Sequence, residues 1–249
     1  MLPATEVIHR WLGTDRPAVV FDFNGTLSND EHILFDIFSD LFQSHLGWAM
    51  SPDDYRRELL GRSDREIVEH AVALHGGVGG DDVTELLRIR KAAYAQRVAV
   101  DRPIEDTTVE LVKTLLAEGI PMAIVTGAQR DDVHAVLAGS PVGQVFEAVV
   151  TEEDVTHGKP HPEGFLLAAN LLRRQPSNVL VFEDSVQGVR AALAAGMHCI
   201  AVAGPDPTPE LTAIAPAMVT SLSADLWRDA KVTTPGASPP GSADRRPST

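Results

Sequence analysis

Acidic residues follow several short apolar segments of this chain, in an arrangement that could act on a phosphate group. Asp22 lies at the end of the strand predicted within the apolar segment 18–23, and Glu183 and Asp184 follow the segment 179–182. A carboxylate such as Asp22 can attack phosphorus and form an aspartyl-phosphate. Because carboxylate and phosphate repel each other, a Mg²⁺ ion held by oxygen ligands from Asp22, Asp184 and Glu183 would offset the repulsion and fix the geometry of attack.

Two further features could serve the phosphate itself. Lys159 lies in the loop "HGKPHPEG", where its compact charge could neutralise the crowded carboxylates. Thr126 and Gly127 end the segment around 122–126, and the Thr126 hydroxyl with nearby backbone N–H groups could hold the phosphate oxygens. His157 and His161 flank Lys159, but we recognise no Cys or acidic partner at ligand spacing and expect no second metal there. Each feature alone also fits a turn, a helix cap or a solvated charge, so the prediction depends on their joint order.

The elements that would bring these residues together follow from an alternation of apolar segments and helical patterns. Apolar segments at 18–23, 122–126, 148–151, 179–182 and 199–203 alternate with helical patterns at 106–118, 130–137, 162–173 and 186–195. This alternation predicts an α/β fold with a doubly wound parallel sheet of the Rossmann type. The carboxyl ends of parallel strands share one edge, where ligands bind. Residues distant in sequence would therefore meet in one pocket.

The block from residue 30 to about residue 102 interrupts this rhythm. It contains no strand pattern and predicts four helices, at 31–46, 52–60, 64–75 and 82–98. We therefore expect an α/β core at 1–28 and 103–230, with a small all-helical domain at 29–102 inserted after the first strand. The segment "HGGVGGDD" follows a helix rather than a strand, which favours a turn over a phosphate loop. Residues 231–249 are rich in Pro, Gly, Ser and Thr and predict a disordered tail.

Composition limits the partners and the compartment. With a formal net charge of −14, the chain lacks the basic face that nucleic acid requires, so we expect no nucleic-acid partner. The small phosphorylated metabolite that we expect as substrate would need local positive charge from a metal ion. No apolar run approaches the roughly 18 residues of a membrane span, and the N-terminus lacks the pattern of a signal peptide. The single cysteine, Cys199, lies in an apolar segment and is expected to be buried. These features predict a cytoplasmic protein without a membrane partner, and they do not decide between monomer and dimer.

The tripeptide Asn24-Gly25-Thr26 fits two common motifs that its surroundings exclude. As Asn-Gly it could turn a hairpin, but a helical pattern rather than a return strand follows. As Asn-x-Thr it could accept a glycan, but only in a secreted chain. What remains is a strand that presents Asp22 on a tight turn containing glycine.

Four motifs together resemble the haloacid dehalogenase-like hydrolase superfamily, whose members are mostly magnesium-dependent phosphatases and phosphomutases. "VVFDFNGTL", "IVTG", "GKPHPEGF" and "VFEDSVQGVRAA" are similar to its first to fourth motifs, over about residues 17–205. The resemblance implies Mg²⁺ as cofactor, Asp22 as nucleophile, Thr126 and Lys159 beside the phosphate, and Glu183 and Asp184 as metal ligands. The helical insert matches the cap of the branch containing β-phosphoglucomutase and phosphoglycolate phosphatase, which closes over the site.

Within the expected cap, "LLGRSDREI" is similar to the family's substrate-contacting loop. Gly61, Arg62 and Ser63 are therefore candidates for contact with the leaving group. Ser63 with Glu66 three residues later is also a capping-box pattern, and both roles can coexist. The β-phosphoglucomutase version of this loop has Arg directly after the Ser, whereas Asp64 stands here. Hydrolysis is therefore favoured over mutase activity.

The family pattern has a second Asp two residues after the nucleophile, which protonates the leaving oxygen and then activates water. This chain has Asn24 there, which can still offer its backbone carbonyl to the metal but cannot exchange a proton near neutral pH. Acid–base catalysis, typically worth about 10² to 10⁴ in rate, should then be missing. We expect a magnesium-dependent phosphatase that prefers good leaving groups or borrows a proton carrier. The alternatives are a catalytically impaired phosphate-ligand binder with a regulatory role, a sugar-phosphate mutase, and a dehalogenase, whose halide leaves unprotonated.

Overall fold

A six-stranded parallel sheet forms the centre of the protein. The computed structural model describes residues 1–59, 62–76 and 83–232. The strand order is β3-β2-β1-β4-β5-β6, and every neighbouring pair is parallel. The strands are β1 (Ala18–Phe21), β2 (Met122–Val125), β3 (Ala148–Val150), β4 (Val179–Glu183), β5 (His198–Val202) and β6 (Met218–Val219). The first five coincide with the predicted apolar segments to within two residues, and the α/β prediction is confirmed. β6 was not predicted because two residues carry no recognisable pattern.

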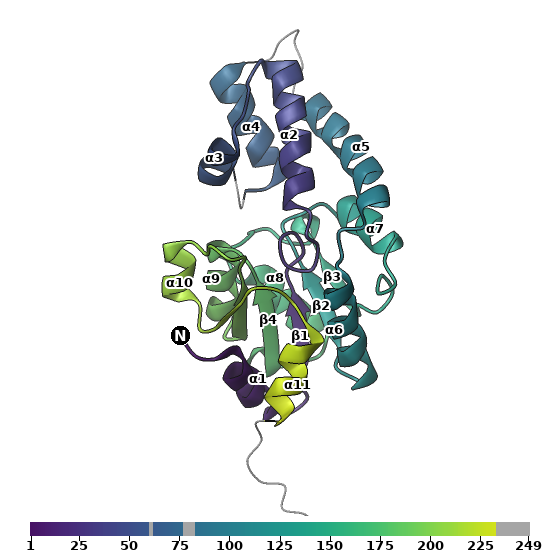
Figure 1. Ribbon diagram of the computed structural model, residues 1–249, viewed down its shortest axis with the longest axis vertical. Coiled ribbons are helices and arrows are strands. Elements are labelled where there is room, and N and C mark those ends of the chain that lie inside the picture. Colours follow the sequence, from purple (N-terminus) through teal and green to yellow (C-terminus); the bar gives the residue numbers. More distant parts are fainter. Residues whose placement is uncertain (60–61, 77–82, 233–249) are drawn as a thin grey trace, which may run out of the picture.

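The strands are apolar on both faces because helices cover both. Along β1, Val19 and Phe21 pack into one layer, whereas Ala18 and Val20 pack into the other. The first layer holds α1 (Ala4–Leu12), α6 (Asp106–Ala117), α7 (Arg130–Ala138) and α11 (Ala224–Val232). The second holds α8 (Glu163–Leu171), α9 (Val186–Ala194) and α10 (Pro209–Ile214) (Figure 1). Two 3₁₀ turns, η2 (Glu152–Asp154) and η3 (Pro176–Asn178), complete the connections of this doubly wound fold.

The helices α1, α10 and α11 were not predicted from the sequence. α1 and α11 pack against each other, with the rings of Trp11 and Trp227 edge to face at 5.5 Å. α11 extends to Val232, two residues into the segment predicted as a tail, and residues 233–249 lie outside the described ranges. Cys199 is buried in β5, as expected.

Four helices inserted after β1 lie above the carboxyl edge of the sheet, and we call them the cap (Figure 1). They are α2 (Glu31–Leu46), α3 (Pro52–Asp54), α4 (Asp64–His75) and α5 (Val83–Asp101). The helix predicted at 52–60 is instead a single turn, α3, that continues as the π-helical turn η1 (Tyr55–Leu59). Most of the segment "HGGVGGDD" lies outside the described ranges. None of the helices in the described part of the chain is long and apolar enough to cross a membrane.

Candidate active site

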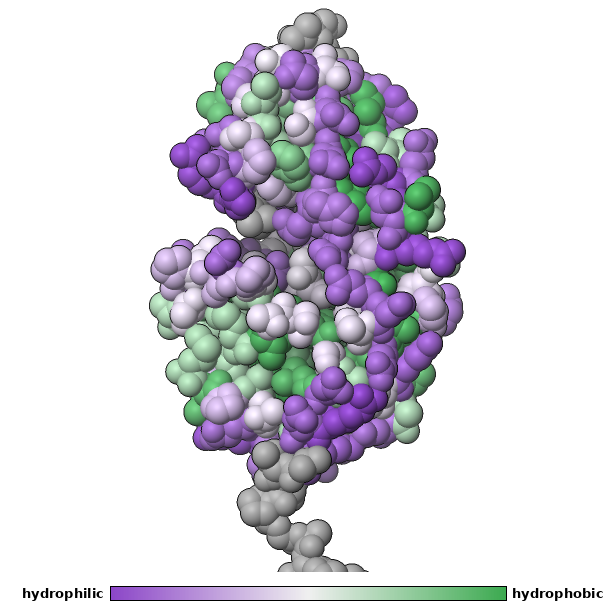
Figure 2. All heavy atoms as spheres, in the orientation of Figure 1, coloured by the Kyte–Doolittle hydropathy of each residue, from purple (hydrophilic) through white to green (hydrophobic). Residues whose placement is uncertain are grey.

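A cavity of about 1050 Å³ lies between the cap and the carboxyl edge of the sheet. Its walls come from the loops after β1, β2, β3 and β4 and from the cap elements α2, η1, α4 and α5. Figure 2 shows the molecular surface indented on one side at this level. Because the chain turns from one side of β1 to the other, with β2 and β4 as its neighbours, the cavity lies at the switch point where α/β folds bind ligands.

Asp22 is presented by a tight turn after β1, as the sequence predicted. The Asp22 N–H donates to the Phe182 carbonyl at 2.9 Å, which keeps the turn registered on β4. Gly25 has φ +77°, and a Cβ on it would lie 2.2 Å from Asp184 Oδ2, so the turn needs glycine on both counts. The Gly25 N–H donates to the Ser28 carbonyl at 2.8 Å, and α2 follows instead of a return strand.

Lys159 lies between two of the predicted carboxylates. Its Nζ contacts Asp22 Oδ1 and is 2.6 Å from Glu183 Oε1. Burial lowers the pKa of the Lys159 ammonium, but the charges of Asp22 and Glu183 raise it more strongly, so the net shift is upward. Lys159 is therefore a fixed positive charge that joins two loops of the α/β part.

Asp22, Glu183 and Asp184 form a crowded acidic cluster, with one oxygen of each within 4.8 Å of the others. Burial is the main cause that raises the pKa of Asp22 to about 7, and Glu183 adds to it while Lys159 opposes it. Burial, followed by the charges of Glu183 and Asp22, raises the pKa of Asp184 well above its usual range. An all-oxygen donor set with one lysine for three acids fits a hard divalent cation such as Mg²⁺.

The Glu183 carboxylate is held from both sides. Its Oε2 accepts hydrogen bonds from the Ser185 N–H at 2.6 Å and the Ser185 hydroxyl at 2.9 Å, while Oε1 faces Lys159. A Cβ on Gly188 would lie 1.6 Å from Oε1, so the first turn of α9 must pass without a side chain there. Glu183 is therefore held by more hydrogen bonds than Asp184. The Asp184 carboxylate accepts one long hydrogen bond, from the Thr26 hydroxyl at 3.4 Å.

The side chain of Asn24 is bound to a buried carboxylate that sequence reasoning missed. Asn24 Nδ2 donates to Asp30 Oδ2 at 2.7 Å, and the Tyr94 hydroxyl donates to the same oxygen. Asp30 is fully buried, and burial raises the pKa of its carboxyl. Asp30 precedes α2 and so matched the pattern of a helix N-cap, yet it makes no side-chain capping bond. Its observed partners are Asn24 and a tyrosine of the cap.

Thr126 and Gly127 line the cavity, as expected of residues that follow β2. The Thr126 hydroxyl accepts a hydrogen bond from the Ala128 N–H at 3.0 Å, which orients it within the loop. Its contact with a phosphate stays a prediction.

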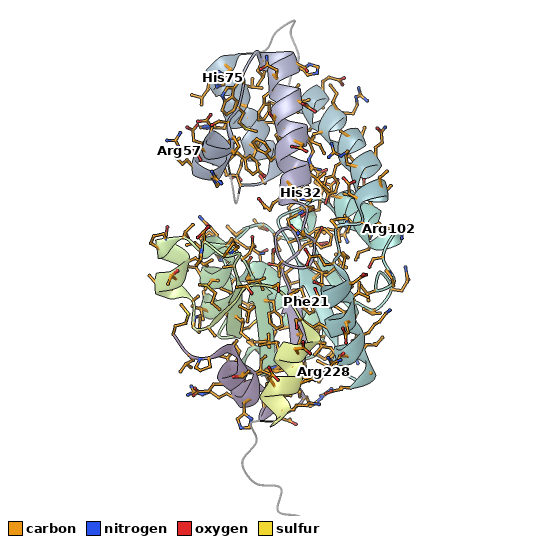
Figure 3. All side chains as sticks on the ribbon, in the orientation of Figure 1. Phe21, His32, Arg57, His75, Arg102 and Arg228 are labelled. Carbon is orange, nitrogen blue, oxygen red and sulfur yellow. The ribbon has the colours of Figure 1, made fainter. Side chains whose placement is uncertain are left out.

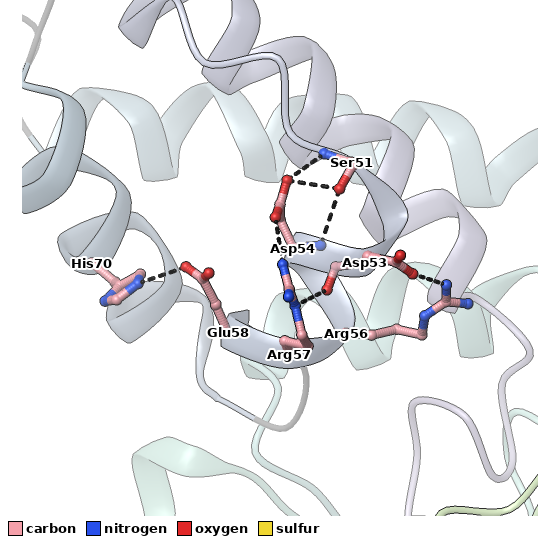
Figure 4. Close-up of polar contacts among 7 residues, drawn as sticks. All are labelled: Ser51, Asp53, Asp54, Arg56, Arg57, Glu58 and His70. Atoms are coloured by element: carbon pink, nitrogen blue, oxygen red, sulfur yellow. Dashed lines mark hydrogen bonds and ion pairs between the residues drawn. The ribbon is translucent and has the colours of Figure 1, made fainter.

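The cap contributes Arg62 and Ser63 to the cavity wall. The capping box is confirmed, because Glu66 accepts from the Ser63 N–H at 2.9 Å and Ser63 Oγ accepts from the Glu66 N–H. Arg62 is exposed, and its side chain has no partner among the described residues. The nearby Arg56 is paired with Asp53 (Figure 4), which leaves Arg62 as the less engaged of the two. Gly61 lies outside the described ranges.

The loop that carries Lys159 also contains an acidic partner for its histidines, so our reason for excluding ligand spacing there was wrong. Glu163 Oε2 is 3.0 Å from His157 Nδ1 and 3.8 Å from His161 Nδ1. The same carboxylate accepts hydrogen bonds from the backbone N–H groups of Thr156 and His157. These bonds explain its position as a brace of the Lys159 loop.

Arg90 of α5 joins the cap to the α/β part and was also missed. Its guanidinium is 3.0 Å from Asp64 Oδ2 at the start of α4 and contacts Asp132 of α7. Arg90 is only 3% exposed and lies over the rings of Tyr94 and Phe38. The cap is therefore fastened to the sheet's helical layer by a buried ionic triad beside the cavity.

A family model described as haloacid dehalogenase-like hydrolase matches residues 19–202. The chain belongs to the haloacid dehalogenase-like hydrolases. The validoxylamine A 7'-phosphate phosphatase of Streptomyces hygroscopicus subsp. limoneus is 32% identical over 182 residues, which are 73% of this chain and 83% of that protein. Hexitol phosphatase A of Escherichia coli (strain K12) is 31% identical over 78% of this chain and 87% of its own length.

Among solved structures, a mutant of CbbY from Rhodobacter sphaeroides, in complex with xylulose-(1,5)bisphosphate, superposes with a TM-score of 0.74. It is 25% identical and covers 84% of this chain and 95% of its own. The resemblance seen in the four motifs is confirmed at the level of the family, and with relatives named as phosphatases this hydrolase is an enzyme of the phosphatase type.

Proposed function

We propose that this protein is a magnesium-dependent phosphomonoester hydrolase that acts through an aspartyl-phosphate on a phosphorylated sugar or sugar-like alcohol. The observation that carries the proposal is the convergence of Asp22, Asp184 and Glu183 with Lys159 on the cavity wall. The named relatives act on phosphorylated compounds of this kind. A cavity of about 1050 Å³ has room for a sugar-sized group beside the phosphate.

In this mechanism Asp22 attacks phosphorus in line with the departing oxygen, and water then hydrolyses the aspartyl-phosphate. Lys159 holds Asp22 in place and offsets the negative charge of the acidic cluster. Asp22 and Asp184, with Glu183 and the Asn24 backbone carbonyl as further candidates, would hold Mg²⁺. Bound there, Mg²⁺ supplies positive charge against the phosphate oxygens.

The leaving group would lie toward the cap. Arg62 and Ser63 are the proposed contacts on that side, because both line the cavity and the Arg62 guanidinium has no ion-pair partner in the described part of the chain. Thr126 and Gly127 are the proposed phosphate contacts on the sheet side.

A phosphate-release screen tests the proposal. Sugar phosphates, polyol phosphates, p-nitrophenyl phosphate and acetyl phosphate are assayed with Mg²⁺ and with EDTA, and haloacids and mutase substrates are run in parallel. We expect phosphate release that EDTA abolishes and that Asp22→Asn lacks. Ligand-dependent thermal stabilisation without turnover of any substrate, acetyl phosphate included, would instead indicate a binding protein, and halide release would indicate a dehalogenase.

A further inference from the structure

The missing proton carrier at residue 24 raises the question of which other group could protonate the leaving oxygen. The Asn24 amide is committed to Asp30, and an amide cannot exchange protons near neutral pH. The leaving groups of sugar and polyol phosphates are alkoxides, which need a proton as they depart. A carrier must therefore be a titratable group that opens onto the cavity beside Asp22.

Glu31 occupies such a position. It is the first residue of α2, where the chain passes from the Asp22 loop into the cap, and Figure 3 labels its neighbour His32 at this junction. Glu31 lines the cavity together with Asp22 and Asn24. It is partly buried, and its carboxylate has no hydrogen-bond or ion-pair partner within the described ranges. Burial, and then the charges of Asp30 and Asp22, raise the pKa of Glu31 to about 7.

The other carboxylates on the cavity wall are already engaged. Asp64 pairs with Arg90, and Glu66 caps α4 through Ser63. Glu152 also lines the cavity, but its charged neighbours are Asp64, Glu153 and Arg65 rather than the nucleophile Asp22.

The remaining titratable groups are less suitable. Asp22, Glu183 and Asp184 form the cluster around Lys159. His157 and His161 are braced by Glu163 and lie exposed, and Asp30 is fully buried and absent from the cavity wall. Among the described residues, Glu31 is therefore the cavity-lining acid that senses the charge of the nucleophile Asp22 and has no hydrogen-bond or ion-pair partner of its own.

We propose that Glu31 is the proton-transfer residue of this enzyme and fills the role that Asn24 cannot. The inference rests on the proposed phosphatase function. As Asp22 forms its bond to phosphorus and the P–O bond to the leaving group breaks, the Glu31 carboxyl gives its proton to the departing oxygen. The resulting Glu31 carboxylate then takes a proton from the water that attacks the aspartyl-phosphate, which releases phosphate, frees the Asp22 carboxylate and restores the Glu31 carboxyl.

The dependence of rate on the leaving group tests this role. With Mg²⁺ present, kcat/KM is measured for wild type and Glu31→Gln on a sugar or polyol phosphate, on p-nitrophenyl phosphate and on acetyl phosphate. We expect Glu31→Gln to slow the alkyl phosphates by about 10²-fold or more, and to change the other two, which leave as stabilised anions, by less than about threefold. Asp36→Asn is the matched control, because it removes the same charge from an exposed position of the same helix and should leave the ranking unchanged.

Three results would overturn the inference: an equal loss on both substrate classes, no loss on either, or a wild-type rate that already falls steeply as the leaving group becomes more basic. The wild-type series needs no variant, so it decides the point even if Glu31→Gln does not fold. Phosphate release from acetyl phosphate with any of these results refutes the role of Glu31 alone. If no substrate releases phosphate, the proposed function is refuted instead.

Discussion

Replacing Arg90 by methionine should show how much the buried ionic triad between the cap and α7 contributes to the stability of the protein. The side chain keeps a similar length and loses its charge, so Asp64 of the cap and Asp132 of α7 are left facing each other without a cation. Arg90 and Asp132 are 3% and 2% exposed, and Asp64 is 13% exposed, so water cannot take the place of the guanidinium. Removing one partner of such a buried ionic group typically costs about 3–5 kcal/mol.

For a chain of this size that loss corresponds to a fall in Tm of about 6–20 °C. Arg97→Met is the matched control on the same helix. Arg97 is 44% exposed and pairs with Asp36 and Asp101 at 3.4 Å, so its removal should cost less than about 1 kcal/mol. Urea unfolding at pH 7 measures both free energies, provided that the slope with denaturant is the same as in wild type.

The stability difference between Arg90→Met and wild type should also depend on pH, in a direction that the pKa shifts determine. Burial is the main cause that raises the pKa of Asp64, to about 6, and Arg90 opposes it, while burial also raises that of Asp132. A carboxyl with a raised folded-state pKa stabilises the fold below its unfolded pKa, and that contribution is lost as pH rises through the folded-state pKa. Without Arg90 both pKa values rise further, so the deficit of Arg90→Met against wild type should shrink from pH 7 to pH 5. A deficit no larger than that of Arg97→Met, or one independent of pH, would refute this reasoning.

Three further predictions concern the site. Asp184→Asn should weaken Mg²⁺ binding at least about tenfold by calorimetry and raise the Tm of the metal-free protein, because it relieves repulsion within the acidic cluster; unchanged affinity here and in Asp22→Asn would exclude the assigned metal site. Lys159→Met should reduce phosphate release by about 10²-fold or more on acetyl phosphate and sugar phosphates alike, since it acts on the nucleophile, and a loss confined to one class would contradict that. Arg62→Ala should change the ranking among sugar phosphates and leave acetyl phosphate turnover intact, whereas a uniform loss would point to a folding role for that loop.

The residues at the strand ends could be placed from the sequence because their position depends only on topology. Once five apolar segments are assigned to a parallel sheet, Asp22, Thr126 and Glu183 must lie along its carboxyl edge. Lys159 followed from the motif around it, and its contacts with Asp22 and Glu183 agree with the charge it was expected to neutralise. The order of the four motifs was therefore enough to predict that these residues meet at one site, without knowledge of side-chain packing.

The residues that were missed depend on packing between distant segments. Arg90 lies in an Arg- and Lys-rich helix that reads as a solvated face, and its burial requires the three-dimensional placement of α4 and α7. Asp30 precedes a helical pattern and Glu31 begins it, and acidic residues are expected at both positions for local reasons. Their burial against the cavity and Tyr94 becomes visible only after the cap folds back over the sheet. Because acidic residues are common at helix starts, the sequence did not reveal that these two acids are buried near Asn24.

The hydrogen bond between Asn24 and Asp30 constrains how this sequence can change over generations. An aspartate in place of Asn24 would set two carboxylates about 2.7 Å apart in a buried site, where they can coexist only by sharing a proton. A single substitution therefore cannot restore an independent acid at residue 24, because residue 30 must lose its charge as well. If residue 24 changes first, two buried carboxylates face each other. If residue 30 loses its charge first, the Asn24 amide loses the carboxylate that accepts its hydrogen bond. We expect the two positions to covary among natural relatives, with an acid at residue 24 accompanied by an uncharged residue at 30. The present pair therefore hinders the return of an acid at residue 24 during evolution.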